Sequence, residues 1–426
     1  MTSRLDERSA LEVSSLLARS TPATARVLDA VLCGHALLIE EATALCAAEG
    51  DDLRALCATA DSLRVQQVGD SVGYVVNRNI NFTNVCVMKC KFCAFSRTRR
   101  STEGYFLDRD EVMRRAQQAH DYGATEVCVQ AGLPPDADRN LYVDLISTLK
   151  RAMPSLHIHA MSPEEVRYGA KLRGMPIIEF LKELKEAGLG SLPGTSAEIL
   201  DDGVRKRLAG GRISTAEWMD VITSAHRIGL PTTATIMYGH IETDRQRMAH
   251  LDLLRSIQQD TGGFTEFVPL SFVHAEAPLH FNQMVPGVRP GPTRDEVTRL
   301  YALSRLVLGA SFRNVQVSWV KEGLERSQEM LACGANDMGG TLMNESISTS
   351  AGAQHGQMMR PRTLRQVIRE AGRVPVQRDT LYRTLRTFDL DGTSDPVEPL
   401  DEVQDVETTF GSYRLLTTAA LLRAAT

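Results

Sequence analysis

The apolar positions of the chain follow two different periods on either side of about residue 70. Up to Gly69 they recur at helical spacing, as in residues 36–45, and the segment Gly50-Asp-Asp-Leu-Arg has the form of a new helix start. From Val75 onwards, short runs rich in β-branched residues alternate with amphipathic segments of helical length. This change predicts an N-terminal helical segment, residues 1–74, followed by a larger α/β domain.

The alternating region contains seven or eight βα units in series. Candidate strands lie at residues 75–85, 125–130, 155–160, 189–191, 232–237, 266–270, 314–318 and 337–340. Helical patterns cover residues 110–122, 141–152, 163–187, 215–228, 245–259, 294–308 and 324–332, the third broken near Gly174 and Pro176. Short connections between such units favour a TIM-type (β/α)8 barrel, closed or partly open, over residues 75–355. An open doubly wound sheet is the alternative, but no GxGxxG fingerprint follows a strand.

The remaining residues, 356–426, are expected to form a C-terminal extension. It is basic and polar at first and loop-like near residues 389–399. Composition changes this picture little, since 43% hydrophobic and 24% charged residues are ordinary for a soluble globular enzyme. A net charge of -5 argues against a nucleic-acid binder, and no apolar run is long enough for a membrane span. The polar N-terminus resembles no export signal, so we expect a cytoplasmic protein.

Three closely spaced cysteines lie in the loop after the first candidate strand. Cys86, Cys90 and Cys93 have the spacing C-x3-C-x2-C, and the next cysteine is Cys128. Three thiolates can hold three irons of a 4Fe-4S cluster, which normally takes four cysteine ligands. The fourth iron is then open to another ligand, and S-adenosylmethionine (SAM) is the best-known occupant. One electron from such a cluster splits SAM and yields a 5'-deoxyadenosyl radical.

Other interpretations of the cysteines fit less well. A structural zinc site takes four ligands, usually in two pairs, and the second pair is missing here. A disulfide is not expected in a chain without a secretory signal. Cys128 has the pattern of a buried strand residue, and Cys33, Cys46, Cys57 and Cys333 have the pattern of packing residues. A zinc-binding interaction protein built on a barrel remains the alternative from another class.

The active site of a TIM-type barrel lies at the carboxyl ends of its strands, and several candidate residues follow the predicted strands. Residues predicted to contact the cofactor are Phe92, Gln130, Gly132, Glu198 and Met237. Among these, Glu198 is a candidate partner of the ribose hydroxyls, with a solvated helix-start carboxylate as the alternative. Candidate proton donors or acceptors are His159, His240 and His274, and of the pair His157 and His159 we expect only the second to face the interior. Candidate substrate ligands are Thr195, Asn336 and Asp337.

The motif residues resemble the radical SAM superfamily. The segment from Asn77-Arg-Asn-Ile-Asn-Phe-Thr-Asn-Val-Cys to Cys-Lys-Phe-Cys-Ala-Phe-Ser-Arg is similar to the branch that makes deazaflavins and, by the futalosine route, menaquinone. Within that branch, five segments resemble the second subunit of FO synthase: Glu103–Phe106, Gln130–Pro135, Ser191–Asp202, Gly262–His274 and Gly334–Ser348. The resemblance covers residues 75–383.

This resemblance implies a radical SAM 4-hydroxyphenyl transferase with one 4Fe-4S cluster on Cys86, Cys90 and Cys93. In that family the deoxyadenosyl radical takes hydrogen from the amino group of L-tyrosine, and the Cα–Cβ bond breaks. The 4-hydroxybenzyl group adds to C5 of 5-amino-6-(D-ribitylamino)uracil, and 2-iminoacetate leaves. FO synthase subunit 1 then closes the deazaflavin ring of the coenzyme F-420 precursor FO. The expected electron donor is reduced flavodoxin or ferredoxin. The net charge and the lack of a long apolar run predict that neither nucleic acid nor membrane is a partner.

Two functional alternatives remain within the superfamily. One is a menaquinone-pathway enzyme, either aminofutalosine synthase or the futalosine cyclase. Those relatives tend to have a glycine-rich run where this chain has Gly194-Thr-Ser-Ala-Glu, which favours the deazaflavin branch. The other is a paralogue that cleaves tyrosine but passes the benzyl group to a different acceptor.

Overall fold

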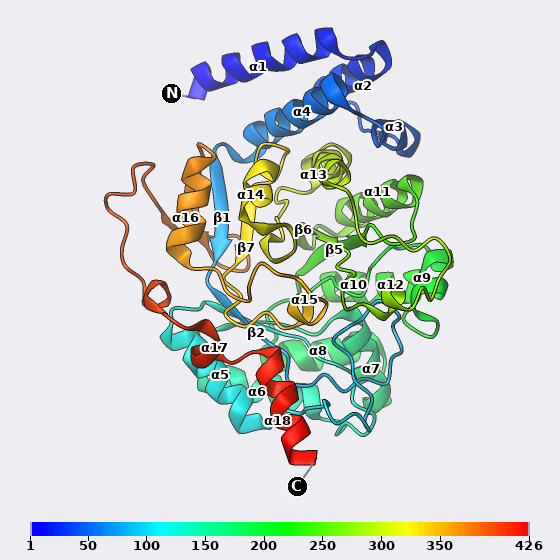
Figure 1. Ribbon diagram of the computed structural model, residues 1–426, viewed down its shortest axis with the longest axis vertical. Helices are drawn as coiled ribbons and strands as arrows, with labels where there is room; N and C mark the ends of the chain where they lie inside the picture. The colour runs from blue at the N-terminus through cyan, green and yellow to red at the C-terminus, as the bar shows by residue number, and fades with distance from the viewer. Residues whose placement is uncertain (1, 425–426) are drawn as a thin grey trace.

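Parallel strands surround a common interior in the computed structural model, which describes residues 2–424 (Figure 1). The strands are β1 (Ser71–Val75), β2 (Asn77–Ile80), β3 (Glu126–Val129), β4 (His157–Ala160), β5 (Thr232–Tyr238), β6 (Phe264–Ser271) and β7 (Asp337–Gly340). Regular parallel ladders join β1 to β7, β2 to β3, β3 to β4, and β5 to β6. Single bridges through Ser191 and Leu192 connect β4 to β5, and bridges through Val315 and Gln316 connect β6 to β7. The predicted (β/α)8 barrel is confirmed, with regular arcs joined by single bridges.

The helices of the barrel follow the predicted strands in order. They are α5 (Arg109–Asp121), α6 (Leu141–Ala152), α7 (Pro163–Arg173), α8 (Ile177–Ala187), α9 (Asp202–Ala209), α10 (Thr215–Arg227), α11 (Asp244–Thr261), α12 (Pro278–Phe281), α13 (Arg294–Leu308), α14 (Trp319–Met330) and α15 (Ile347–Ser350). Ser162, Ser214, Thr243 and Thr293 each form a capping box, which is why these starts agree with the sequence pattern. The pattern missed α9. Among the described residues, no helix is both long and apolar enough to cross a membrane.

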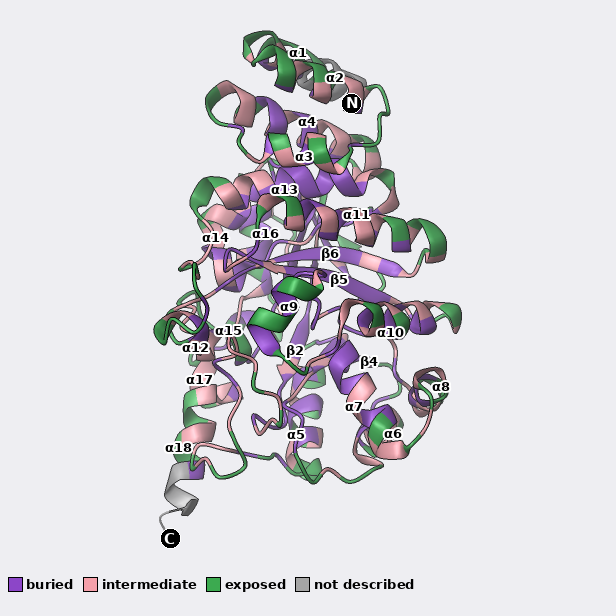
Figure 2. Ribbon diagram, turned by 90° about the vertical axis from the view of Figure 1, so that its right-hand side faces the viewer, coloured by how far each residue is buried: buried purple, intermediate pink, exposed green. Residues whose placement is uncertain are grey.

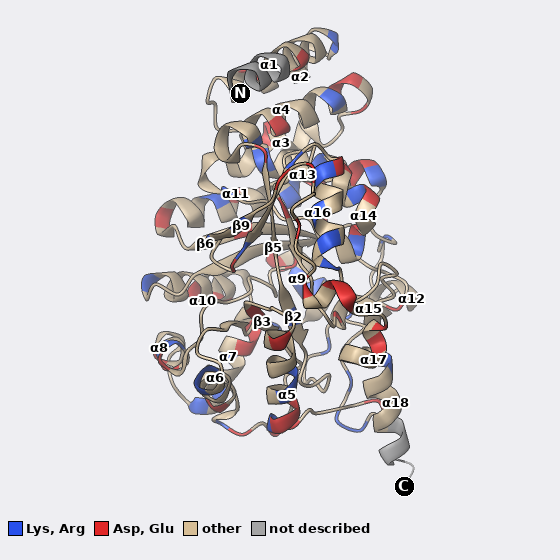
Figure 3. Ribbon diagram, turned by 90° about the vertical axis from the view of Figure 1, so that its left-hand side faces the viewer, with Lys and Arg blue, Asp and Glu red and all other residues tan. Residues whose placement is uncertain are grey.

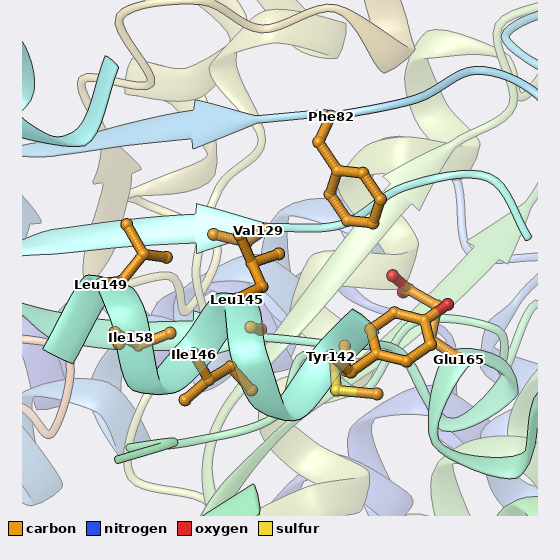
Figure 4. A pocket seen from close by; sticks show the side chains of 10 residues that line it. Phe82, Val129, Tyr142, Leu145, Ile146, Leu149, Ile158 and Glu165 are labelled. Carbon is orange, nitrogen blue, oxygen red and sulfur yellow. The ribbon is translucent and has the colours of Figure 1, made fainter. Parts of the chain in front are cut away.

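Strands β3 and β4 show how the two faces of the barrel wall differ. On the outer face, Val129 and Ile158 lie in an apolar layer with Leu145 of α6 (Figure 4). At alternate positions, Cys128 and His159 line the interior instead. Figure 2 shows the same division for the whole molecule, with buried strands inside a shell of helices that are exposed on their outer sides. The period of two therefore decides which residues can reach a ligand inside the barrel.

The N-terminal helices are α1 (Thr2–Arg19), α2 (Pro22–Leu32), α3 (Ile39–Leu45) and α4 (Gly50–Val68). They lie at one end of the molecule, beside the start of β1 (Figure 1). There α4 contacts α13, and α3 contacts α11. This segment therefore covers the end of the barrel opposite the carboxyl ends of the strands.

The C-terminal extension adds strands that the sequence pattern did not predict. It contains α16 (Pro361–Glu370), β8 (Val374–Arg378), β9 (Thr384–Thr387), α17 (Val406–Phe410) and α18 (Tyr413–Ala424). Strand β8 pairs with β1 in parallel, in the sheet order β7-β1-β8-β9. The basic helix α16 (Figure 3) is held by the following loop, because Arg365 pairs with Asp395 at 2.8 Å and with Glu398 at 2.8 Å. The domain boundaries at residues 74 and 355 stay a prediction, although β8 joins the barrel sheet.

A buried histidine couples the fold to pH. In His250, on α11, Nδ1 accepts a hydrogen bond from the Leu200 backbone N–H at 3.0 Å, and Nε2 donates to the Thr235 carbonyl at 3.0 Å. Burial lowers the pKa of His250 to about 3. As pH falls below the unfolded value near 6.5, the unfolded chain binds the proton first, so the free energy of unfolding decreases until about pH 3.

We therefore expect His250→Gln to flatten the pH dependence of stability between about pH 6.5 and 4. The lost slope is at most ~1.4 kcal/mol per pH unit. Urea unfolding at a series of pH values measures it. His120→Gln, on an exposed position of α5, is the control and should leave the slope unchanged. Equal slopes for wild type and His250→Gln would contradict the assignment.

Candidate active site

A cavity of about 1130 Å³, its open mouth included, runs through the barrel interior. We call each parallel segment of the barrel a stave. The eight staves are β1 together with β2, the five strands β3 to β7, and the short segments near Ser191 and Val315, and each contributes to the cavity wall. Polar wall residues are Asn77, Glu126, Gln130, His159, Thr195, Thr235, Glu266 and Gln316.

The end of the cavity where the strands begin is closed by β8. Arg378 forms a bidentate ion pair with Asp337, with Nε–Oδ2 2.5 Å and Nη2–Oδ1 2.8 Å. Its Nη2 also lies 3.4 Å from Glu266 Oε2, and its guanidinium lies 3.9 Å from the ring centroid of Tyr382. The Tyr382 hydroxyl donates a hydrogen bond to the Glu266 carboxylate, and burial raises the pKa of Glu266 to about 7. Ligands therefore have to enter from the carboxyl ends of the strands.

The cysteine loop lies at those carboxyl ends, directly after β2. Its start is fixed by the Cys86 N–H, which donates to the Arg97 carbonyl at 2.9 Å. Its middle is fixed at Lys91, whose N–H donates to the Leu208 carbonyl at 3.0 Å and whose carbonyl accepts from the Leu279 N–H at 2.6 Å. The loop is thus tied by backbone hydrogen bonds to the segments around α9 and α12.

The three thiols of this loop are suited to an iron–sulfur cluster. Cys86, Cys90 and Cys93 are free and half-buried, and burial raises the pKa of Cys86 and, to about 12, that of Cys90. Binding of iron would release those protons. Among the described residues, no three His, Cys, Asp or Glu side chains gather tightly enough for a single metal ion. A zinc site needs such a group, whereas each thiolate of a cuboidal cluster binds a different iron.

Arg212 connects the cysteine loop to the segment before α9. Its guanidinium lies 5.5 Å from the centroid of the Phe92 ring, and its Nη1 lies 2.7 Å from Glu198 Oε1. Arg205 Nη1 lies 3.5 Å from the other oxygen. Glu198 is only 11% exposed and precedes α9, so the solvated helix-start alternative is wrong. Ser196 and Glu198 both have positive φ, 62° and 40°, a strained backbone that is often found at ligand sites.

Gly132 makes room for protein backbone, and its predicted contact with the cofactor stays a prediction. Its N–H donates to the Thr83 carbonyl at 2.8 Å, and the next residue, Leu133, accepts from the Val87 N–H at 2.8 Å. A Cβ atom on Gly132 would lie 2.4 Å from the Val85 carbonyl oxygen. The segment after β3 therefore packs against the entry to the cysteine loop, and only glycine allows this approach.

We expect Gly132→Ala to push these segments apart. The free energy of unfolding should fall by about 1–3 kcal/mol, as for other overpacked sites, and less iron should bind per chain. Urea unfolding and iron analysis measure the two effects. Gly210→Ala is the matched control, since Gly210 has φ -57° and a Cβ there would lie 3.7 Å from the Lys206 carbonyl oxygen, an ordinary van der Waals contact. Equal iron content in both variants would contradict this role.

Gln130 and Thr195 are brought together from the two staves on either side of β4. Gln130 Nε2 donates to Thr195 Oγ1 at 2.6 Å, and both side chains line the cavity. Met237, also half-buried, is joined to the Glu198 segment by its backbone N–H, which donates to the Glu198 carbonyl at 3.0 Å. Their contacts with cofactor or substrate stay predictions.

His159 lines the cavity, but the prediction that His157 faces the opposite side of the strand is wrong. The rings of His157 and His159 both lie 2.7 Å from Ser191 Oγ, because side chains two positions apart in a strand share a face. Burial lowers the pKa of His159 to about 4. The ring is therefore neutral near pH 7 and can accept a proton but has none to give as an imidazolium.

The other two predicted histidines do not line the cavity, and their prediction as catalytic residues is corrected. His240 is fully buried in the turn after β5, where Nε2 donates to the Met237 carbonyl at 2.9 Å and Nδ1 accepts from the Ile241 N–H at 2.7 Å. The ring of His274 packs against that of His280 with centroids 4.8 Å apart. Both follow strand ends, but His240 is enclosed by protein, and His274 is half-buried in a neighbouring groove outside the cavity.

Asn336 and Asp337 are also corrected as substrate ligands. They stand at the start of the last stave, since β7 begins at Asp337, and so lie at the end opposite the cysteine loop. Asn336 Oδ1 accepts from Arg305 Nη2 at 2.8 Å and from the Val315 N–H at 2.9 Å. Asp337 is committed to Arg378. Both side chains stabilise the barrel floor.

Sequence analysis missed several cavity residues, among them Glu126, Gln316, Lys321 and Arg378. Glu126 could have been found, because Glu126-Val-Cys-Val-Gln alternates and Gln130 was already placed inside. Arg378 could not, because its strand was not predicted and no local pattern indicates where it pairs.

Two family patterns together match most of the chain. The Radical SAM superfamily pattern matches residues 80–254, which include the cysteine loop and β3 to β5. The pattern of the CofH/MqnC C-terminal region matches residues 261–389, which include β6 to β9 and therefore the floor residues Glu266, Asp337 and Arg378. The extension that closes the barrel is thus a family feature.

Similar proteins cover the same region. The 5-amino-6-(D-ribitylamino)uracil--L-tyrosine 4-hydroxyphenyl transferase of Methanothermobacter thermautotrophicus is 47% identical over 346 residues, 81% of this chain and 94% of that protein. The transferase of the same name from Methanopyrus kandleri is 46% identical over 87% of this chain and 100% of that protein. The FO synthase of Mycobacterium leprae is 48% identical over 80% of this chain but only 39% of that longer protein.

Among solved structures, the FeFe-hydrogenase maturase HydG from Carboxydothermus hydrogenoformans is similar in fold. Its TM-score is 0.66 at 14% identity, covering 100% of this chain and 95% of that chain. This likeness supports the barrel, whereas the sequence relatives identify the branch. The chain belongs to the radical SAM family of 5-amino-6-(D-ribitylamino)uracil--L-tyrosine 4-hydroxyphenyl transferases.

Proposed function

We propose that this chain transfers the 4-hydroxybenzyl group of L-tyrosine to 5-amino-6-(D-ribitylamino)uracil in FO biosynthesis. The observation that carries the proposal is the 47% identity to a transferase of this name over 94% of its length. The chain spans the whole transferase but only part of the fused FO synthase. FO synthase subunit 1 is the proposed functional partner.

Membership of the radical SAM superfamily implies a 4Fe-4S cluster and SAM. Cys86, Cys90 and Cys93 are the proposed cluster ligands, since all three thiols lie on one anchored loop beside the cavity mouth. With the cluster bound and reduced, SAM supplies the 5'-deoxyadenosyl radical. Glu198 is the proposed partner of the SAM ribose, because a carboxylate paired with Arg212 keeps free acceptor positions.

The cavity explains how a carbon radical could be kept from water. Its floor is closed by Arg378 and Asp337, and several polar groups of its wall are tied to neighbours, as in the Gln130–Thr195 hydrogen bond. The apolar side chains of Leu270, Val317 and Trp319 line the same space and offer few hydrogen-bonding groups to a ligand. A benzyl fragment held there would meet few groups that could quench it.

A direct assay tests the proposal. The anaerobically reconstituted protein is incubated with SAM, dithionite, tyrosine and the ribityl-diaminouracil, and products are identified by mass spectrometry. The expected products are deoxyadenosine and the benzylated uracil. Purine nucleoside substrates in place of the uracil test the menaquinone-pathway alternative, which the CofH/MqnC pattern shares. Tyrosine cleavage without benzylated uracil would indicate a different acceptor.

The electron donor and the compartment belong to the same proposal. Reduced flavodoxin or ferredoxin is the proposed donor, and the cytoplasm is the proposed compartment. The eight free cysteines of the described chain support a reducing environment. Replacement of dithionite by either donor with its reductase tests the first point in the same assay.

A further inference from the structure

The proposed substrate L-tyrosine carries a carboxylate, and the cavity offers few cations for it. Of the lining residues, only Lys321 and Arg378 carry a positive charge at neutral pH. Arg378 is taken, since Asp337 and Glu266 already contact its guanidinium. This leaves Lys321 as the cation for an incoming anion.

Lys321 has no hydrogen bond or ion pair through its side chain among the described residues. Its acidic neighbours are engaged elsewhere. The Glu345 carboxylate accepts from the Ser348 N–H at 2.8 Å and 2.9 Å, and Glu322 accepts from the Ser271 hydroxyl. Burial lowers the pKa of Lys321, and Glu345 and Glu322 only partly offset this effect. A buried ammonium without a partner is costly, so a ligand carboxylate would be stabilising there.

The position of Lys321 suits a ligand group at the mouth. It lies three residues after Ser318, at the carboxyl end of its stave, where the backbone N–H groups of Lys321 and Glu322 both donate to the Ser318 carbonyl at 3.0 Å. Gly323, with φ 75°, then interrupts the helical path of α14. Lys321 lines both the central cavity and a neighbouring groove that contains Phe272. It therefore stands where the cavity opens.

We propose that Lys321 Nζ binds the carboxylate of L-tyrosine, an inference that rests on the proposed function. The aromatic ring of the substrate would then extend along the apolar wall formed by Leu270, Val317 and Trp319. The diaminouracil is a weaker candidate for this position because it carries no carboxylate. The carboxylate of SAM is the competing ligand, and the test includes it.

A thermodynamic cycle with two ligands and two proteins tests this contact. Binding of tyrosine and of tyramine, which lacks the carboxylate, is measured by calorimetry on the reconstituted enzyme with SAM and without reductant. The wild type should bind tyrosine about 10- to 100-fold more tightly than tyramine, as expected for a hydrogen bond between charged groups. Lys321→Gln should abolish this difference in affinity. The variant should also bind 3-(4-hydroxyphenyl)propionate, which keeps the carboxylate but lacks the amino group, more weakly than the wild type does. Lys321→Arg should retain part of it.

Controls separate the possible failures. Lys182→Gln, on the exposed face of α8, should bind both ligands as the wild type does. Lys321→Gln should keep its SAM affinity and its unfolding midpoint. If Lys321→Gln still prefers tyrosine, or loses SAM binding instead, this inference is wrong while the proposed function stands. If the wild type binds no tyrosine and forms no benzylated product, the proposed function fails too.

Discussion

Cys90→Ala should abolish the formation of deoxyadenosine from SAM. Changes to residues that merely support metal ligands cost 10- to 100-fold, so loss of a ligand should cost more than about 100-fold. Cys90 is the middle thiol of the proposed set, and its loop is fixed by backbone hydrogen bonds on both sides. No neighbouring thiol can move in to replace it, because Cys128 lies on the wall of the cavity in β3.

The measurement combines iron and sulfide analysis, electron paramagnetic resonance of the reduced protein, and chromatography of deoxyadenosine. The spectrum of the wild type should change when SAM is added, whereas that of the variant should not. Cys33→Ala, at an exposed thiol after α2, is the matched control and should retain full activity. Turnover by a reconstituted Cys90→Ala protein would disprove the ligand assignment.

Arg378→Met should cause the largest loss of stability. Asp337 is fully buried, and the variant would leave its carboxylate without a counter-ion. Although burial opposes it, Asp337 holds the pKa of Arg378 well above its ordinary value, so Arg378 is charged at neutral pH. Breaking such a pair from one side costs about 3–5 kcal/mol. Urea unfolding of the apoprotein measures the change.

Two further variants show whether the cost comes from the buried charge. Arg383→Met removes an arginine five residues away that is 75% exposed and pairs with Asp379, so it should cost less than about 1 kcal/mol. Combining Arg378→Met with Asp337→Asn should recover part of the loss, since the amide can still accept from the Gly339 N–H. A loss for Arg378→Met no larger than that for Arg383→Met would contradict the role of the floor.

Local signals explain why the barrel could be predicted from the sequence. Strand and helix periods are properties of a few neighbouring residues. The capping boxes at Ser162, Ser214 and Thr293 are motifs only four residues long, and each marks the start of a helix. The three cysteines are likewise close in sequence, and a single loop places them together. The predicted helix at residues 294–308 accordingly agrees with α13 at both ends.

Predictions failed where a side chain had to be oriented by distant parts of the chain. His240 and His274 follow strand ends as an active-site residue would, but His240 is buried in its turn and His274 lines a neighbouring groove instead of the cavity. The predicted strand at residues 337–340 agrees with β7, but Asn336 and Asp337 stand at its start, where the active site of a barrel does not lie. Each error concerns direction, and a periodic pattern does not fix direction in loops and short strands.

The sequence by itself determined the order of strands and helices, the cysteine loop and the branch of the family, because these depend on local period and on long contiguous motifs. The tertiary structure alone decided what closes the barrel and which cation faces the cavity. Arg378 meets Asp337 only after β8 has paired with β1, about 300 residues earlier in the chain. Lys321 stays available only because Glu345 and Glu322 are engaged by other groups. Such partners are fixed by packing between distant segments, and no local pattern encodes them.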